Sequence, residues 1–197
     1  MSQADLDDVE LVAIGGSAGC FEVLRGALPA TIGERGCPPI VIVVHLPSEG
    51  PALLHELLGT GSELRMKQAA DKEPVERNTV YFAPPGYHLL VERQRTLALS
   101  VDEAVHYSRP SIDVLFESVA WAYGPRALGV LLSGASEDGA AGLQRIAEAG
   151  GTVAVQDPAS ALAPTMPAAA LRRLPQIERR LNPSQIGHLL GSLAHAR

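Results

Sequence analysis

Residues 11–19 read LVAIGGSAG. The first four are apolar, two of them are β-branched, and the two glycines that follow end the apolar run. A short, continuous apolar run that ends in a turn is typical of a strand buried on both faces. The small residues after it predict a tight turn into a helix over 21–28, which Pro29 stops.

The same pattern recurs along the chain. Residues 40–44, IVIVV, predict a second buried strand, and 51–58 predict a helix after it. Strand, helix and strand patterns follow again over 127–132, 140–149 and 152–155. Alternating strands and helices are typical of a parallel sheet that carries helices on both faces. The sequence therefore predicts an α/β protein with a doubly wound, mostly parallel sheet.

The middle of the chain differs. Residues 79–83 alternate polar and apolar side chains, 84–86 form a Pro-Pro-Gly turn, and 88–91 and 96–101 predict strands around a polar turn. Together these segments predict an antiparallel hairpin appendage attached to the main sheet.

Two more helices complete the pattern. One begins after Ser111, a good N-cap, and has apolar residues at helical spacing up to Tyr123. The last begins at Asn182-Pro183 and carries Ile186, Leu189, Leu190 and Leu193. Since no repeat, linker or low-complexity segment interrupts the chain, residues 1–197 are expected to form a single domain.

Composition narrows the class of protein. The 197 residues hold 16 Lys and Arg against 22 Asp and Glu, a formal net charge of −6. Nucleic acid is not an expected partner, because phosphates require clustered basic residues. Cys20 and Cys37 cannot build a disulfide framework, and the acidic N-terminus is not a signal peptide. No apolar run approaches the ~20 residues of a membrane span, so a cytoplasmic protein without membrane insertion is expected.

Ligands of open parallel sheets bind outside the carboxyl ends of the strands. Ser17 follows the first predicted strand, His45 follows the second, and Asp138 lies shortly after the strand over 127–132. These are the nucleophile, general base and orienting acid of a serine hydrolase. Residues 15–19 also match the nucleophile-elbow pattern Gly-x-Ser-x-Gly. The structural alternative is a plain tight turn.

Other interpretations of the first loop fit less well. A dinucleotide site needs the motif Gly-x-Gly-x-x-Gly and an acid after the second strand, but this chain has Ser17 at the third motif position and His45 after the second strand. A P-loop needs a Lys-Ser/Thr pair that is absent, and the α/β-hydrolase order of serine, acid and histidine differs. Without metal-ligand spacing, the remaining histidines are expected at the surface or in turns: His55, His88, His106, His188 and His195.

Three further residues have both a functional and a structural interpretation. Cys20 lies in the first turn of a predicted helix, where a thiol pKa can fall, but packing is the expected role. Asp113 and Asp157 could be site carboxylates, yet a helix N-terminal charge and a turn explain them equally simply.

The order of these residues and the motifs around them resemble the chemotaxis receptor methylesterases of the CheB type. The matching segments are VAIGGSAG (12–19), VVHLP (43–47), YFAPPGYHL (81–89), SRPSIDVLFESVA (108–120), GVLLSGASEDGAAGL (129–143), AEAGGTVAVQD (147–157) and APTMPAAAL (163–171). In this family the matching serine, histidine and aspartate form the catalytic triad, and they fall on Ser17, His45 and Asp138. The chain departs from the common family pattern at Ala18, Cys20, Ala135 and Ser136.

The resemblance implies a single CheB-type catalytic domain that removes methyl groups from γ-glutamyl methyl esters of chemoreceptors, releases methanol and also deamidates receptor glutamines. It implies no metal or cofactor. Ser17 would attack the ester and His45 would take its proton through Nε2. Asp138 would accept the Nδ1–H of His45, and N–H groups near Ala18 and Ala135 would bind the oxyanion.

The implied partners are the methylated cytoplasmic helices of chemoreceptors, and a separate regulatory protein is an alternative means of control. The best-known members of this family also carry an N-terminal receiver domain, which covers the active site. Only about ten residues precede the first strand here, so no receiver domain is expected in this chain, and activity is expected without phosphorylation. Two alternatives stay open: a receptor-binding scaffold domain with weak or no catalysis, and an esterase that acts on another substrate.

Overall fold

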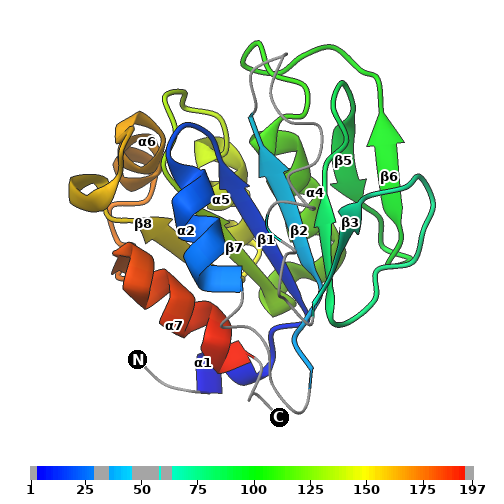
Figure 1. Cartoon of the computed structure of the whole chain (residues 1–197), viewed down its shortest axis with the longest axis horizontal. Coiled ribbons are helices and arrows are strands. Elements are labelled where there is room, and N and C mark those ends of the chain that lie inside the picture. Colours follow the sequence, from blue (N-terminus) through cyan, green and yellow to red (C-terminus); the bar gives the residue numbers. More distant parts are fainter. Residues whose placement is uncertain (1–3, 29–35, 46–57, 59–63, 194–197) are drawn as a thin grey trace.

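The computed structural model describes residues 4–28, 36–45, 58 and 64–193. Its centre is a seven-stranded sheet with strand order β3-β4-β2-β1-β7-β8-β9, in which the paired strands are parallel (Figure 1). The strands are β1 (Leu11–Gly16), β2 (Ile40–Val44), β3 (Arg65–Gln68), β4 (Thr79–Phe82), β7 (Ala127–Leu131), β8 (Thr152–Gln156) and β9 (Arg180–Leu181). The predicted doubly wound parallel sheet is confirmed.

Helices cover both faces of this sheet (Figure 1). One face carries α1 (Ala4–Asp7), α2 (Cys20–Ala27) and α7 (Pro183–Leu193). The other carries α4 (Ile112–Tyr123), α5 (Ala140–Glu148) and α6 (Thr165–Arg173). Two 3₁₀ turns, η2 (Gly124–Arg126) and η3 (Pro158–Ser160), lie in the connections. Within the described residues, no helix is both long and apolar enough to cross a bilayer.

Alternate residues of the central strands supply two separate apolar layers. In β1, Leu11 and Ala13 pack under α4, α5 and α6, whereas Val12 and Ile14 pack under α1, α2 and α7. Successive side chains of a strand point to opposite faces of the sheet. A central strand covered on both faces must therefore be apolar at every position, which is why the runs at 11–14 and 40–44 predicted strands correctly.

The antiparallel appendage consists of β5 (His88–Val91) and β6 (Leu97–Ser100), which form a separate two-stranded sheet. The prediction that residues 79–83 belong to this hairpin was wrong, because β4 lies inside the main sheet and is parallel to β2 and β3. All four β4 side chains are buried. The polar ones find local partners: the Thr79 hydroxyl donates to the Arg77 carbonyl and the Tyr81 hydroxyl to the Pro74 carbonyl.

Four elements were not predicted: α1, β3, α6 and β9. The strands β3 and β9 are the two edges of the sheet, and their polar sequences, RMKQ and RL, lack a buried-strand pattern. The predicted helix over 51–58 lies outside the described residues, except for Leu58, which is buried. Asn182 caps α7 as expected, since its side-chain oxygen accepts the Gln185 amide at 3.0 Å.

Close contact between α4 and α5 gives a test of this packing. A Cβ added to Gly142 would lie 2.6 Å from Cβ of Phe116 and 2.9 Å from the carbonyl oxygen of Asp113. We predict that Gly142→Ala lowers the free energy of unfolding by about 1–3 kcal/mol, because the two helices must move apart. Chemical denaturation measures this change.

The matched control is Gly26→Ala in α2, where an added Cβ meets nothing within 4 Å. This substitution should leave the protein equally stable or stabilise it by up to about 1 kcal/mol, because alanine favours helices. Equal losses in the two variants would contradict close packing of α4 on α5.

Candidate active site

The strands β2, β1 and β7 are neighbours in the middle of the sheet, and their carboxyl ends lie side by side (Figure 1). Gly16 at the end of β1 is in register with Val44, and Gly15 with Leu131. Ser17 therefore leaves the sheet between His45 on one side and the loop over 132–139 on the other. Backbone hydrogen bonds fix these ends: the His45 amide donates to Gly16 at 3.0 Å, and the Ser17 amide donates to Ser133 at 2.8 Å.

The structure brings two of the predicted residues into direct contact. His45 Nε2 lies 2.8 Å from Asp138 Oδ2, and the side chains are 12% and 0% exposed. The prediction that Nδ1 faces the carboxylate was wrong, because the ring presents Nε2 to Asp138. A carboxylate that accepts the Nε2–H holds the neutral ring in the tautomer whose Nδ1 carries the free lone pair. Nδ1 is therefore the nitrogen that can act as a base.

Four donors hold the carboxylate of Asp138. Besides His45, they are the Ser111 hydroxyl at 2.9 Å, the Ile112 amide at 2.7 Å and the Asp113 amide at 3.0 Å. The last three belong to the N-terminus of α4, where unpaired amides and the helix dipole favour a negative charge.

These donors decide the charge of Asp138. Burial acts to raise the pKa of this carboxyl, but the hydrogen bonds from His45 and from the Asp113 and Ile112 amides together hold its pKa below the ordinary value. Asp138 is therefore a buried anion at neutral pH.

Ser17 lies at the turn between β1 and α2. A Cβ added to Gly134 would lie 3.0 Å from Cβ of Ser17, so the loop after β7 passes directly beside the serine. Among the described residues, no hydrogen bond joins the Ser17 hydroxyl to the His45 ring. Catalytic hydrogen bonds are often long without substrate. The structure thus places Ser17 at the strand end next to the His45–Asp138 pair.

Ser133 connects the loops around Ser17. Its hydroxyl donates to the Ala18 carbonyl at 2.7 Å and accepts the Ala163 amide at 2.9 Å, while its own amide donates to the Gln156 side chain at 2.9 Å. The sequence places Ser133 and Gln156 after predicted buried strands, but that position alone did not indicate a role for either residue.

The amides of Ala18 and Ala135, predicted as oxyanion donors, are available for that role. Neither amide has a hydrogen-bond acceptor among the described residues. Ala18 precedes Gly19, the N-cap of α2, and Ala135 lies in the loop that passes beside Ser17. Two unpaired N–H groups next to a nucleophile can stabilise a developing oxyanion.

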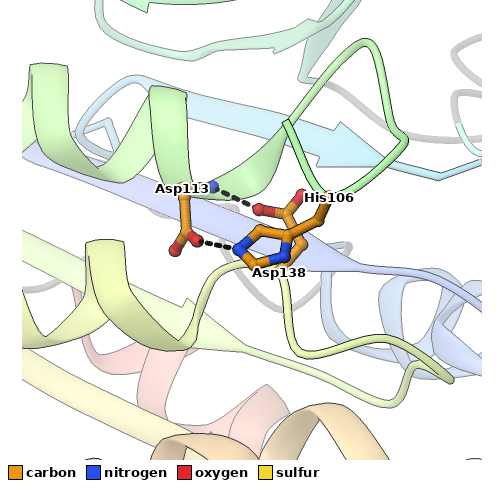
Figure 2. A group of neighbouring side chains, drawn as sticks. All are labelled: His106, Asp113 and Asp138. Atoms are coloured by element: carbon orange, nitrogen blue, oxygen red, sulfur yellow. Dashed lines mark hydrogen bonds and ion pairs between the residues drawn. The ribbon is translucent and has the colours of Figure 1, made fainter. Parts of the chain in front are cut away.

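Figure 2 shows a second cluster of titratable groups, His106, Asp113 and Asp138. Their ligating atoms lie within 4.8 Å of one another, so we tested whether they fit a metal ion. They do not, because each Asp138 oxygen already accepts two hydrogen bonds and offers no free lone pair. Asp113 in turn accepts the Gly142 amide at 2.6 Å and lies 3.3 Å from Nε2 of His106. Burial raises the pKa of Asp113, and the neighbouring charge of Asp138 acts in the same direction.

The remaining candidates have structural roles. Burial raises the pKa of the Cys20 thiol to about 12, so Cys20 packs in the core as expected and is not reactive. Asp157 forms a turn in which its carboxylate accepts the Ala159 amide at 3.0 Å. His188 is exposed, as predicted, but the prediction of a surface or turn position for His88 was wrong, because this residue is buried. His55 and His195 lie outside the described residues.

The parallel sheet defines an α/β protein in which Ser17 lies at one strand end and the His45–Asp138 pair at the neighbouring ends. The chain belongs to the CheB methylesterase family, whose model matches residues 12–190.

Individual relatives agree with this assignment. A Leptospira interrogans protein named putative protein-glutamate methylesterase/protein-glutamine glutaminase is 41% identical over 162 residues, which cover 82% of this chain and 83% of that protein. A Caulobacter vibrioides protein-glutamate methylesterase/protein-glutamine glutaminase is 38% identical over 191 residues, which cover 95% of this chain and 55% of the relative. The crystal structure of the Thermotoga maritima CheB methylesterase catalytic domain matches with a TM-score of 0.87 at 28% identity, covering 94% of this chain and 98% of that one.

The charge of Asp138 leads to a prediction with two readouts. An amide at this position lacks the charge and directs an N–H toward donors that have no other acceptor. We predict that Asp138→Asn lowers kcat by roughly 10²–10⁴ with little change in KM, and lowers the free energy of unfolding at pH 7 by about 1–3 kcal/mol. Enzyme kinetics and urea denaturation measure the two effects.

The difference in stability also has a defined pH dependence. Because the pKa of folded Asp138 is lowered, its stabilising contribution is present above the 3.8 of an ordinary aspartate and is lost as the pH falls through the lower folded value. The stability gap between wild type and Asp138→Asn should therefore shrink below about pH 4. A gap that is constant down to pH 2, or an unchanged kcat, would contradict a catalytic anion at position 138.

Proposed function

We propose that this protein is a protein-glutamate methylesterase that hydrolyses γ-glutamyl methyl esters on chemoreceptor helices, and that it also converts receptor glutamines to glutamates. The observation that carries this proposal is the hydrogen bond between His45 and the buried Asp138, formed at the strand ends on either side of Ser17. The names of the Leptospira and Caulobacter relatives, which combine an esterase and a glutaminase, support both reactions.

In the first half of the reaction, Oγ of Ser17 attacks the ester carbonyl carbon while Nδ1 of His45 takes the hydroxyl proton. The ring becomes an imidazolium ion, and its Nε2–H remains bonded to Asp138, whose negative charge stabilises it. The carbonyl oxygen becomes an oxyanion that the amides of Ala18 and Ala135 can bind. As the intermediate collapses, the C–O bond to the methoxy group breaks and His45 protonates the leaving oxygen, which departs as methanol.

In the second half, a water molecule attacks the glutamyl ester formed on Ser17. His45 takes a proton from the water through Nδ1 and returns it to Oγ of Ser17 when the intermediate collapses. The products are a glutamate side chain and the free serine. A glutamine substrate follows the same steps, with ammonia leaving in place of methanol. Every proton transfer uses His45, so these steps require no metal or cofactor.

Substitution of the nucleophile or the base tests this function. We predict that Ser17→Ala and His45→Ala each lower kcat for methanol release from methylated receptor by roughly 10⁴–10⁶, because the members of a triad act as a unit. Ser17 is only partly buried, so the melting temperature of Ser17→Ala should change little. His45→Ala also removes a donor to the buried Asp138 carboxylate and should lower the free energy of unfolding by about 1–3 kcal/mol while the protein still folds. Gly26→Ala, with open space at the substituted position, serves as the control.

Labelling with a fluorophosphonate probe separates the proposed enzyme from a receptor-binding scaffold, since only an activated Ser17 reacts. We expect one label per chain in the wild type and none in Ser17→Ala. Activity above about a tenth of wild type in either alanine variant would refute the triad. Hydrolysis of small esters together with no release of methanol from methylated receptor would identify an esterase with another substrate.

A further inference from the structure

His88 is a buried histidine that the mechanism above does not use. It is the first residue of β5, in the antiparallel appendage, and its side chain is hidden from solvent. Nε2 lies 3.0 Å from the carbonyl oxygen of Glu103, and Nδ1 lies 3.1 Å from the amide nitrogen of Ser111. Both ring nitrogens therefore bind backbone groups, and these belong to two different segments of the chain.

The chemistry of the two partners fixes the protons on the ring. A carbonyl oxygen can only accept a hydrogen bond, so Nε2 must carry a hydrogen. A backbone amide can only donate, so Nδ1 must offer its lone pair. His88 is therefore the neutral Nε2–H tautomer, with a donor on one side and an acceptor on the other.

Ser111 links this histidine to the active site. It is the fully buried N-cap of α4, and its hydroxyl donates to Oδ1 of Asp138 at 2.9 Å. The next two amides along the chain, those of Ile112 and Asp113, donate to the same carboxylate. The helix itself has no acceptor for the amides of its first turn, and His88 supplies the acceptor for the amide at its start.

Further contacts hold His88 against α4. At the other end of β5, the Val91 amide donates a hydrogen bond to the Ser118 hydroxyl of α4 at 3.0 Å. The carbonyl oxygen of Glu103, in the segment after β6, accepts the hydrogen bond from Nε2 of His88. The appendage therefore places His88 at a defined position relative to the N-terminal turn of α4.

We propose that His88 is a positioning residue for Asp138. By accepting the Ser111 amide, it fixes the turn from which three of the four donors reach the carboxylate, and through Asp138 it sets the orientation of the His45 ring. The role in catalysis rests on the proposed function. A misplacement of about 1 Å at a catalytic group can cost on the order of 100-fold in rate, so a single distant hydrogen bond is sufficient to matter.

The first test compares two substitutions of His88. His88→Phe keeps an aromatic ring but removes both hydrogen bonds, and it should lower kcat about 10- to 100-fold while KM changes less than about threefold. His88→Gln retains one acceptor and one donor and should stay within about fivefold of wild type. His188→Phe, the same change at an exposed histidine of α7, is the control and should have no effect.

The second test asks whether the effect passes through Asp138. In a double-mutant cycle, His88→Phe should lower kcat by less than about threefold further when Asp138 is already asparagine, because coupled residues are not additive. The downfield proton resonance of the His45 Nε2–H, observed by NMR, should shift or broaden in His88→Phe and return in His88→Gln. A residue with a merely structural role would change stability without this pattern.

Several outcomes would overturn the proposal. They are an unchanged kcat and resonance in folded His88→Phe, full additivity with Asp138→Asn, or a folded His88→Gln variant as impaired as the phenylalanine variant. If His88→Phe does not fold, the glutamine variant alone decides between these results. If wild type releases no methanol but the His45 resonance still responds to His88, the proposed function fails and the positioning role stands.

Discussion

The burial of the Asp138 carboxylate is the central constraint of this structure. Transferring an ionised group into a protein interior is costly unless hydrogen bonds replace the water it loses. Asp138 is completely buried and accepts four such bonds, three of them from the start of α4. The N-terminus of this helix must therefore lie at the end of β7. Its contacts with α5 and with the β5–β6 appendage are the means by which the fold keeps it there.

The same helix terminus also constrains β1, the strand that precedes Ser17. A Cβ added to Gly15 would lie 2.2 Å from Cγ2 of Ile112, so only a glycine lets α4 approach β1 this closely. The Gly-x-Ser-x-Gly pattern explains Gly15 by the tight turn that follows it. The contact with Ile112 is a second reason why this position must be glycine. The serine, the histidine and the aspartate are held together because one helix end touches the strands or loops that carry them.

Much of this could be predicted from the sequence, because the relevant patterns are local. The central strands are apolar at every position, and Ser17, His45 and Asp138 directly follow three of them or lie in the next loop. What could not be predicted depends on distant partners. Ser111 lies 27 residues from Asp138, and His45 lies 93 residues from it, so spacing could reveal neither the donor nor which ring nitrogen faces the carboxylate.

The misassigned segments have a similar cause. In β4, Thr79 and Tyr81 suggested a solvent-facing side, but their hydroxyls bind backbone carbonyls inside the protein. His88 was expected near the surface because an isolated histidine gives no sign of two backbone partners, one in the loop after β6 and one at α4. A polar side chain in a sequence shows that a hydrogen-bond partner is needed. Only the fold shows whether that partner is water or a group inside the protein.

The four donors to Asp138 differ in whether a point mutation can remove them. Two of the four are main-chain amides, at positions 112 and 113, and no exchange of side chain other than to proline removes a main-chain amide. Genetic drift at these two positions can alter packing while the electrostatic support of the anion persists. Only His45 and Ser111 contribute through atoms that a point mutation can delete. Half of the support for the buried charge is thus encoded in backbone geometry, where most mutations cannot reach it.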